Sequence, residues 1–512
     1  MSDIAVAESG TRLQNFLDCA GLRGFPWKTA TILYTISWGW LFIVRDSLWS
    51  DDWDAFKFPE LRGVTDVYNS LGFAPWMKTN FLLFEALGAG IFRLLIFVFF
   101  FNSALFIYGI VNKSDLFISS QCKAFALFFL ILPFNSARLS LNTFHYSSAY
   151  FLFFLAWYLL VAFHSRRSKF LACVLFFLSF QMFTMLVFFV LPVLFHFFLN
   201  GRGSKRDAKK WLHENLFLIL LPIAYWILRS LFWPNSRSYH EVTENKISSF
   251  LRFVMLFLLI IVGLLTLYRW LESSYKKAVF LLLVGLFSMY VGYVPYLIYG
   301  LAGYGFGVPS NYLITMFGRS DWFSRHQILQ PLGFSILLIG LLGLLPSIAG
   351  KVKSWTFGAV LAISVVFNVA FGFEYVVDYS KQMSVVDALE AKPIKTAGDE
   401  IQMVDQTAFL NARQRSYRER DWLGLVGLAE GIESAKKLKV VGGCSENLSS
   451  RLVLIQGPET HWEALQNWVS DGDMGFKVTV DDKPGACKPE MVTSERVSGA
   501  IPILFYFTGA KD

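Results

Sequence analysis

The chain has 512 residues, of which 55% are hydrophobic and only 16% charged, and its mean hydropathy is +0.47. Soluble globular proteins carry charge on roughly a quarter of their residues, and disordered chains lack an aromatic content such as the 17% found here. The composition therefore excludes both classes and indicates an integral membrane protein.

The net charge of +8 is unevenly distributed along the chain. From Asp378 to the end, 16 Lys and Arg oppose 20 Asp and Glu, a balance of −4, so the first 377 residues carry the remaining +12. Short cytoplasmic loops of membrane proteins collect Lys and Arg. The basic excess therefore indicates membrane topology and does not indicate binding to nucleic acid.

Residues 1–28 predict a cytoplasmic N-terminal lead without a cleavable signal, and residues 29–377 predict a transmembrane domain. A spanning helix needs about 20 mostly apolar residues. The candidate spans are 29–48, 88–112, 116–134, 147–163, 214–233, 250–268, 278–300, 327–349 and 356–374. The stretch 170–200 is uncharged, too long for one span and flanked by two basic loops. It predicts a helical hairpin that turns near Ser179, Gln181 and Thr184, and the count becomes about eleven membrane segments.

The basic residues also predict the orientation. Fourteen of them lie in short loops on one side of the predicted spans, against eight in longer loops on the other side. The first set is expected to be cytoplasmic. We therefore expect a cytoplasmic N-terminus, an exoplasmic C-terminal segment, and residence in the bacterial inner membrane with that segment in the periplasm.

Residues 378–512 predict a separate exoplasmic domain of α+β type. Its helical patterns cover roughly 397–412 and 419–437, and its β-like runs cover 437–441, 452–455, 476–480 and 501–507. Cys444 and Cys487 are the two cysteines of this segment, and a disulfide between them suits an oxidising compartment. The segment is either an acceptor-binding module or a lid and stabiliser.

The first outside loop, 49–80, opens with an acidic cluster directly after the first span. Asp51, Asp52 and Asp54 lie within four residues, with Trp53 between them. One interpretation is a solvated helix end with an interfacial tryptophan. The other is a catalytic or metal-binding cluster at the membrane surface, because neighbouring carboxylates can raise one another's pKa and create a general base. Carboxylate oxygens also suit Mg²⁺ or Mn²⁺, although no complete ligand set is recognisable.

This plan resembles the GT-C membrane glycosyltransferases. They have a first span, a long exoplasmic loop that opens with AspAsp or AspXxxAsp, many further spans and a C-terminal exoplasmic domain. The resemblance rests on Asp51-Asp52-Trp53-Asp54 and on the architecture. It implies transfer of a sugar from a polyprenyl-phosphate donor to a cell-envelope glycan or lipid acceptor at the exoplasmic face, among membrane lipids. Asp51 and Asp52 would then be catalytic or acceptor-orienting, with Asp54 and Trp53 beside the substrate.

A lipid-phosphate donor needs cations near the membrane surface. Arg319, Arg325 and His326 follow a stretch, 278–318, that carries no charge. They predict either a phosphate clamp or arginines that snorkel to the interface.

Three further residues are candidates for substrate binding. Arg93 lies within an apolar run, where a charge usually faces the protein interior, and Glu85 is its alternative structural partner. Arg138 and His145 lie in the third outside loop. His145 is either a substrate contact or an interfacial histidine with satisfied hydrogen bonds.

Two other functions remain open. A polysaccharide or lipid-carrier transporter or assembly factor would use the same basic residues without cleaving a bond. A glycan polymerase or ligase would depend on the outside loops and arginines more than on the first-loop aspartates. Replacing Asp51 or Asp52 with Asn should abolish turnover by a glycosyltransferase, whereas a transporter should depend on buried charges such as Arg93.

Overall fold

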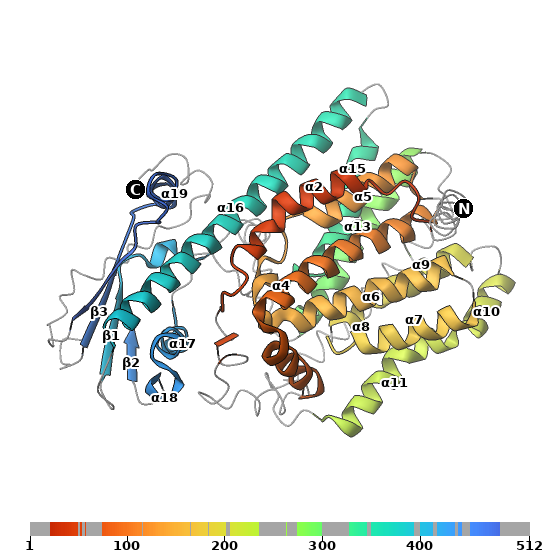
Figure 1. Cartoon of the computed structure of the whole chain (residues 1–512). Coiled ribbons are helices and arrows are strands. Elements are labelled where there is room, and N and C mark those ends of the chain that lie inside the picture. The colour runs from red at the N-terminus through yellow and green to blue at the C-terminus, as the bar shows by residue number, and fades with distance from the viewer. Residues whose placement is uncertain are drawn as a thin grey trace, which may run out of the picture.

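The chain forms a helical bundle with a small β-sheet at one end (Figure 1). The computed structural model describes residues 21–49, 52–53, 57, 74–114, 116–163, 165–182, 184–200, 205–234, 263, 274–298, 327–345, 350–393, 400–412, 417–435, 439–442 and 451–481. The bundle helices are α2 (Trp27–Trp38), α4 (Ala74–Asn112), α5 (Ser119–Ile131), α6 (Phe144–Ala162), α7 (Arg166–Ser179), α8 (Thr184–Phe188), α9 (Val190–Asn200), α10 (Lys205–Glu214), α11 (Leu216–Phe232), α13 (Ser274–Ile298), α15 (Gln330–Leu344) and α16 (Gly350–Ala391).

Several of these helices have the length and composition of membrane spans. Four segments qualify: Phe81–Asn112, Phe144–Ala162, Tyr275–Gly292 and Gly350–Ala391. A fifth follows if the bent pair α10 and α11 is one span. These helices support an integral membrane protein. They do not establish the expected eleven segments, and the expected span 250–268 lies almost wholly outside the described residues.

The hairpin expected within 170–200 is present. Helix α7 ends at Ser179, and α8 begins at Thr184. The turn between them is closed by backbone hydrogen bonds, including Met182 N–H to the Ser179 carbonyl at 3.2 Å. Phe180 in the turn packs its ring against Phe189, with centroids 5.2 Å apart. An uncharged 31-residue run therefore folds back on itself, as its length required.

The first expected span, 29–48, is shorter than predicted. Helix α2 ends at Trp38, and a 3₁₀ turn, η1 (Gly39–Phe42), follows. The Trp40 indole leaves the helix to stack on Tyr375 of α16, with centroids 5.2 Å apart and planes 7° from parallel. Because α16 has Gly372 at this contact, where a Cβ would overlap Trp40, the indole lies directly on the helix backbone.

Helix α4 is broken at Gly88, whose φ of +73° is a conformation that glycine adopts at little cost. The break separates the expected amphipathic approach, 79–90, from the span that follows it.

Helices α13 and α15 also depend on glycine for their close packing. A Cβ at Gly333 of α15 would lie 2.6 Å from the backbone nitrogen of Met289. Such close backbone approach at small residues is a common way for membrane helices to associate.

The sheet lies at the far end of α16 (Figure 1). Its strands are β1 (Glu400–Asp405), β2 (Lys439–Gly442), β3 (Arg451–Gln456) and β4 (Lys477–Asp481), in the order β2-β1-β3-β4. β1 pairs in parallel with β2 and β3, whereas β4 is antiparallel to β3. The accompanying helices are α17 (Glu419–Glu430), α18 (Ile432–Ala435) and α19 (His461–Asp471).

The sheet corrects one prediction and confirms others. The helix expected over 397–412 is wrong, because 400–405 form the central strand β1. The expected helix over 419–437 and the strands near 437–441, 452–455 and 476–480 are confirmed, whereas 501–507 lies outside the described residues. The expected domain boundary at 378 falls inside α16, which continues to Ala391.

Candidate functional site

Asp52 joins the first loop, which opens at Trp49, to the loop between α5 and α6, residues 132–143, which is called the third loop below. Its carboxylate is fully buried and accepts three hydrogen bonds. The Ser140 hydroxyl donates to Oδ1 at 2.6 Å, and the backbone N–H groups of Trp49 and Leu141 donate to Oδ2 at 3.1 and 3.0 Å. The Asp52 backbone N–H in turn donates a hydrogen bond of 3.0 Å to the Trp49 carbonyl. Asp52 therefore positions two loops that are almost 90 residues apart in sequence.

Trp53 extends this junction toward the sheet. Its side chain is 1% exposed and lies against Gly424 of α17, where a Cβ would overlap the indole ring. Trp49 packs its ring edge-on to Tyr375 of α16 at 5.2 Å. The first loop, the third loop and the sheet-bearing segment thus meet at Asp52 and Trp53.

Arg93 is buried in the bundle beside this junction. Its Nη2 donates to the Ser47 carbonyl at 2.8 Å, and the carboxylates of Asp52 and Asp46 act on its guanidinium. Its Nε and Nη1 are buried and make no hydrogen bond to the described residues. A charged group inside a span usually faces a protein interior and marks a functional position. Arg93 is therefore a cation with donors still available at the acidic loop.

Arg138 is held in an aromatic clamp. Its guanidinium carbon lies 3.6 Å from the centre of the Trp38 ring and 4.1 Å from that of Phe100. Its Nη2 and Nε donate to the carbonyls of Phe134 and Asn135 at 2.7 and 3.1 Å. Burial lowers the pKa of Arg138 to about 10, which leaves it charged at neutral pH. These contacts fix Arg138 in the third loop, while its buried Nη1 makes no hydrogen bond to the described residues, so its role in substrate binding stays a prediction.

His145 lies at the start of α6, partly buried, with its ring 4.2 Å from that of Tyr146. It is on the side of the bundle that carries the third loop. Seven other predicted residues lie outside the described part of the chain: Asp51, Asp54, Arg319, Arg325, His326, Cys444 and Cys487. The catalytic pair, the phosphate clamp and the disulfide therefore remain predictions.

The described residues contain no group of three or more His, Cys, Asp or Glu side chains that could hold a metal ion. Of the proposed oxygen ligands Asp51, Asp52 and Asp54, only Asp52 is among them. Its carboxylate accepts three hydrogen bonds, which use three of the roughly four lone-pair positions of an ionised carboxylate, so the metal site stays a prediction.

The sequence analysis missed a second buried network, which fastens α16 to the sheet. Lys381 donates to Asp405 Oδ2 at 2.8 Å, and its ammonium lies 4.8 Å from the centre of the Tyr417 ring. The Tyr417 hydroxyl and the Ala412 N–H both donate to Asp378. The signal for this network in the sequence is the pair Asp378 and Lys381, which are three residues apart and therefore lie on one helix face.

No protein-family model, no curated protein and no solved structure matches this chain.

Proposed function

We propose that the protein is a membrane glycosyltransferase that transfers a sugar from a polyprenyl-phosphate donor to a cell-envelope glycan or lipid. The observation that supports this proposal is the junction at Asp52. There the acidic first loop, the third loop and the sheet-bearing segment converge beside Arg93, a buried cation with unused donors. An acidic loop next to a cation suits an acceptor hydroxyl and an anionic leaving group.

The two aspartates take different roles in this proposal. Asp52 is fully buried and accepts three hydrogen bonds, so it serves as the positioning residue of the loop. Asp51, its direct neighbour in sequence, is the candidate general base. Asp54 flanks the acceptor site, Trp53 anchors the loop against α17, and the acceptor is a glycan or lipid hydroxyl.

The reaction is a displacement at the anomeric carbon of the donor. The acceptor oxygen forms the new glycosidic bond and gives its proton to Asp51. The bond between the anomeric carbon and the phosphate oxygen breaks, and the electron pair leaves with the polyprenyl phosphate. Arg325, with Arg319 or Arg93, neutralises the departing phosphate, because fixed cations are most effective where charge develops in a site shielded from water.

The test is sugar transfer in envelope membranes at matched expression. Mass spectrometry of total glycans would compare wild type with Asp51→Asn, Asp52→Asn and the control Asp46→Asn. Asp46 is an exposed carboxylate on the same segment, bound to Arg45 at 3.0 Å. A general base contributes about 10²–10⁴-fold, so Asp51→Asn should lose at least about 100-fold in transfer without losing stability. Asp46→Asn should match wild type.

An unchanged glycan profile in both the Asp51 and Asp52 variants, in cells where deletion alters it, would refute the proposal. A lipid-carrier or polysaccharide transporter is the second candidate function, and the burial of Arg93 with two unused donor nitrogens favours it. In that case Arg93→Gln should abolish export of the glycan, whereas Asp51→Asn should leave it intact.

A further inference from the structure

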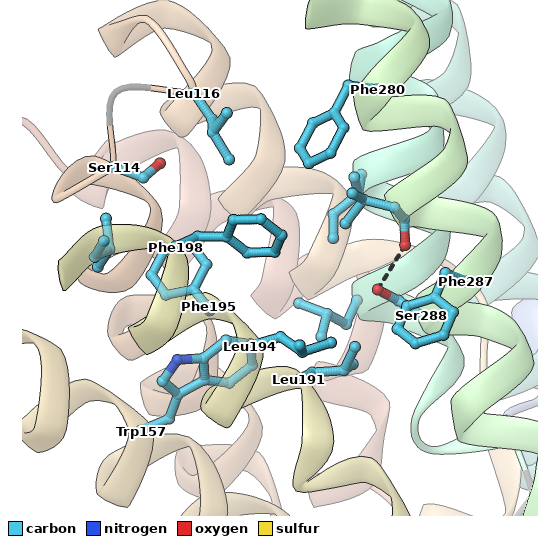
Figure 2. A pocket seen from close by; sticks show the side chains of 14 residues that line it. Ser114, Leu116, Trp157, Leu191, Leu194, Phe195, Phe198, Phe280, Phe287 and Ser288 are labelled. Atoms are coloured by element: carbon cyan, nitrogen blue, oxygen red, sulfur yellow. Dashed lines mark hydrogen bonds between the residues drawn. The ribbon is translucent and has the colours of Figure 1, made fainter. Parts of the chain in front are cut away.

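A cavity lies between α9, α13 and α15, away from the Asp52 junction. Figure 2 shows Phe195 and Phe198 of α9 opposite Phe280 and Phe287 of α13, with Trp157 at one side. The cavity has a volume of about 90 Å³ and is partly open to the surface. Of its fourteen lining residues, twelve are apolar and the other two are serines. It is therefore a site for hydrocarbon.

Neither serine requires a polar ligand. Ser288 donates its hydroxyl hydrogen to the Val284 carbonyl at 2.7 Å, the dashed line in Figure 2. Ser114 donates in the same way to the Val111 carbonyl at 2.9 Å. With both hydroxyl donors satisfied within the protein, a saturated or isoprenoid chain can fill the cavity without leaving a buried donor unpaired.

The cavity belongs to the opposite end of the bundle from Asp52. Arg93, beside Asp52, and Ser114, at the cavity, are 21 residues apart along α4 and the turn that follows it. At 1.5 Å per residue the separation is about 30 Å, the thickness of the hydrocarbon core of a bilayer. The phosphate of a lipid-linked sugar donor bound at the Asp52 junction is therefore too far away to contact this cavity.

Three lysines lie close in sequence to residues that line the cavity. Lys113 directly precedes Ser114, and Lys276 and Lys277 lie one helical turn before Phe280 on α13. Lys113 and Lys276 are exposed, and Lys277 is half-buried. An apolar cavity with lysines one turn from its lining complements a molecule with a hydrocarbon tail and an anionic head.

Helix α10 adds a basic surface at the same end. Trp211 donates from Nε1 to His196 Nδ1 at 2.9 Å, which fastens α10 to α9 one residue from the cavity-lining Phe195. Arg206, Lys209 and Lys210 are exposed on α10. Basic amphipathic helices of this kind lie at membrane surfaces that contain anionic lipids.

We propose that this cavity binds an anionic phospholipid, with one acyl chain between α9, α13 and α15 and the phosphate beside Lys276, Lys277 and Lys113. The occupant comes from the leaflet adjoining the α10 face. The site is separate from the proposed glycosyltransferase site, and its occupancy does not depend on that activity.

The test is lipid binding to the purified full-length chain in detergent, followed by native mass spectrometry. The probes are phosphatidylglycerol, phosphatidylcholine with the same acyl chains, and a polyprenyl phosphate. A cation near an anionic membrane surface contributes roughly fivefold in affinity, so Lys276→Gln with Lys277→Gln should weaken phosphatidylglycerol binding about 25-fold. Binding of phosphatidylcholine should not change. The matched control is Lys351→Gln with Lys353→Gln, two lysines at the start of α16 that do not line the cavity.

A second variant tests the cavity itself. Val284→Phe places a ring into the space between α13 and α9, and it should reduce binding of both phospholipids while the lysines stay intact. Equal phosphatidylglycerol affinities for the two double-lysine variants would overturn the proposal. Tighter binding of the polyprenyl phosphate than of phosphatidylglycerol, lost in Val284→Phe, would assign the cavity to a carrier lipid and also overturn it. Neither result bears on sugar transfer at Asp51.

Discussion

Replacing Asp52 with Ala should destabilise the protein far more than replacing it with Asn. Alanine removes the acceptor of three buried donors: the Ser140 hydroxyl and the N–H groups of Trp49 and Leu141. A buried donor left without a partner costs about 1–3 kcal/mol. The sum is about 3–9 kcal/mol, and the Ser140 hydroxyl lowers it where it can rotate to another acceptor. The two backbone donors alone set the lower bound, so Asp52→Ala should cost at least about 2 kcal/mol.

Asparagine keeps one carboxamide oxygen at the position of Oδ2, where it can still accept from Trp49 and Leu141. The Ser140 hydroxyl can reverse its role and accept from the amide nitrogen. The variant then loses mainly the charge assistance, which roughly doubles the strength of such bonds. We expect a cost of about 1–2 kcal/mol for Asp52→Asn.

The measurement is reversible unfolding of the purified protein in mixed micelles, with increasing sodium dodecyl sulfate. Asp46→Ala is the control. The Asp46 side chain is 60% exposed, and its ion pair among the described residues is with the adjacent Arg45. Equal midpoints for Asp52→Ala and Asp46→Ala would refute the reasoning. Equal midpoints for Asp52→Ala and Asp52→Asn would show that the backbone donors do not depend on this carboxylate.

Three further predictions concern packing and pH. Gly424→Ala should separate α17 from the Trp53 indole, which a Cβ would overlap, and increase proteolysis of the sheet-bearing segment. Gly333→Ala should cost about 1–3 kcal/mol in micellar unfolding through overpacking of α15 on α13; Gly358→Ala, with open space at its Cβ, is the control for both glycines. Burial lowers the pKa of His461 below its ordinary 6.5, outweighing the opposite effect of Glu374. As the pH falls, the unfolded chain therefore binds the proton before the folded protein does, so the free energy of unfolding should be constant above about pH 6.5 and decrease below it. His461→Gln should reduce this decrease. Equal pH profiles of stability for wild type and His461→Gln would contradict the assignment.

Patterns local in sequence predicted much of the fold. The uncharged run 170–200 was too long for one span and had basic loops on both sides, so a hairpin was the solution that its length allowed. Three strands beyond residue 435 were recognisable as short apolar runs between turn residues. Strand β1 was mistaken for a helix because it is central and covered on both faces. Its residues Ile401, Gln402, Met403 and Val404 are all buried, so the alternation of an exposed strand is absent.

Contacts distant in sequence could not be predicted in this way. The acidic motif identified Asp52, but nothing in the motif indicates that its partners are Ser140 and Leu141. Arg138 was recognised as a loop residue and a candidate for substrate binding, but its aromatic surroundings were not. Its burial depends on Trp38, one hundred residues earlier, and on Phe100. The early end of α2 likewise follows from Tyr375, more than 300 residues later in the chain.

Helix α16 has a mechanical consequence for the molecule. Its 42 residues make a rod about 63 Å long at 1.5 Å per residue, and this single helix runs from the bundle to the sheet (Figure 1). Asn368 fixes its middle by donating to the Ile131 carbonyl at 2.7 Å, and Lys381 fixes its far end to β1. A change in the tilt of this helix, of the kind that bilayer thickness produces, must therefore swing the sheet as a lever arm. The orientation of the sheet over the first loop is thus coupled to the dimensions of the surrounding membrane.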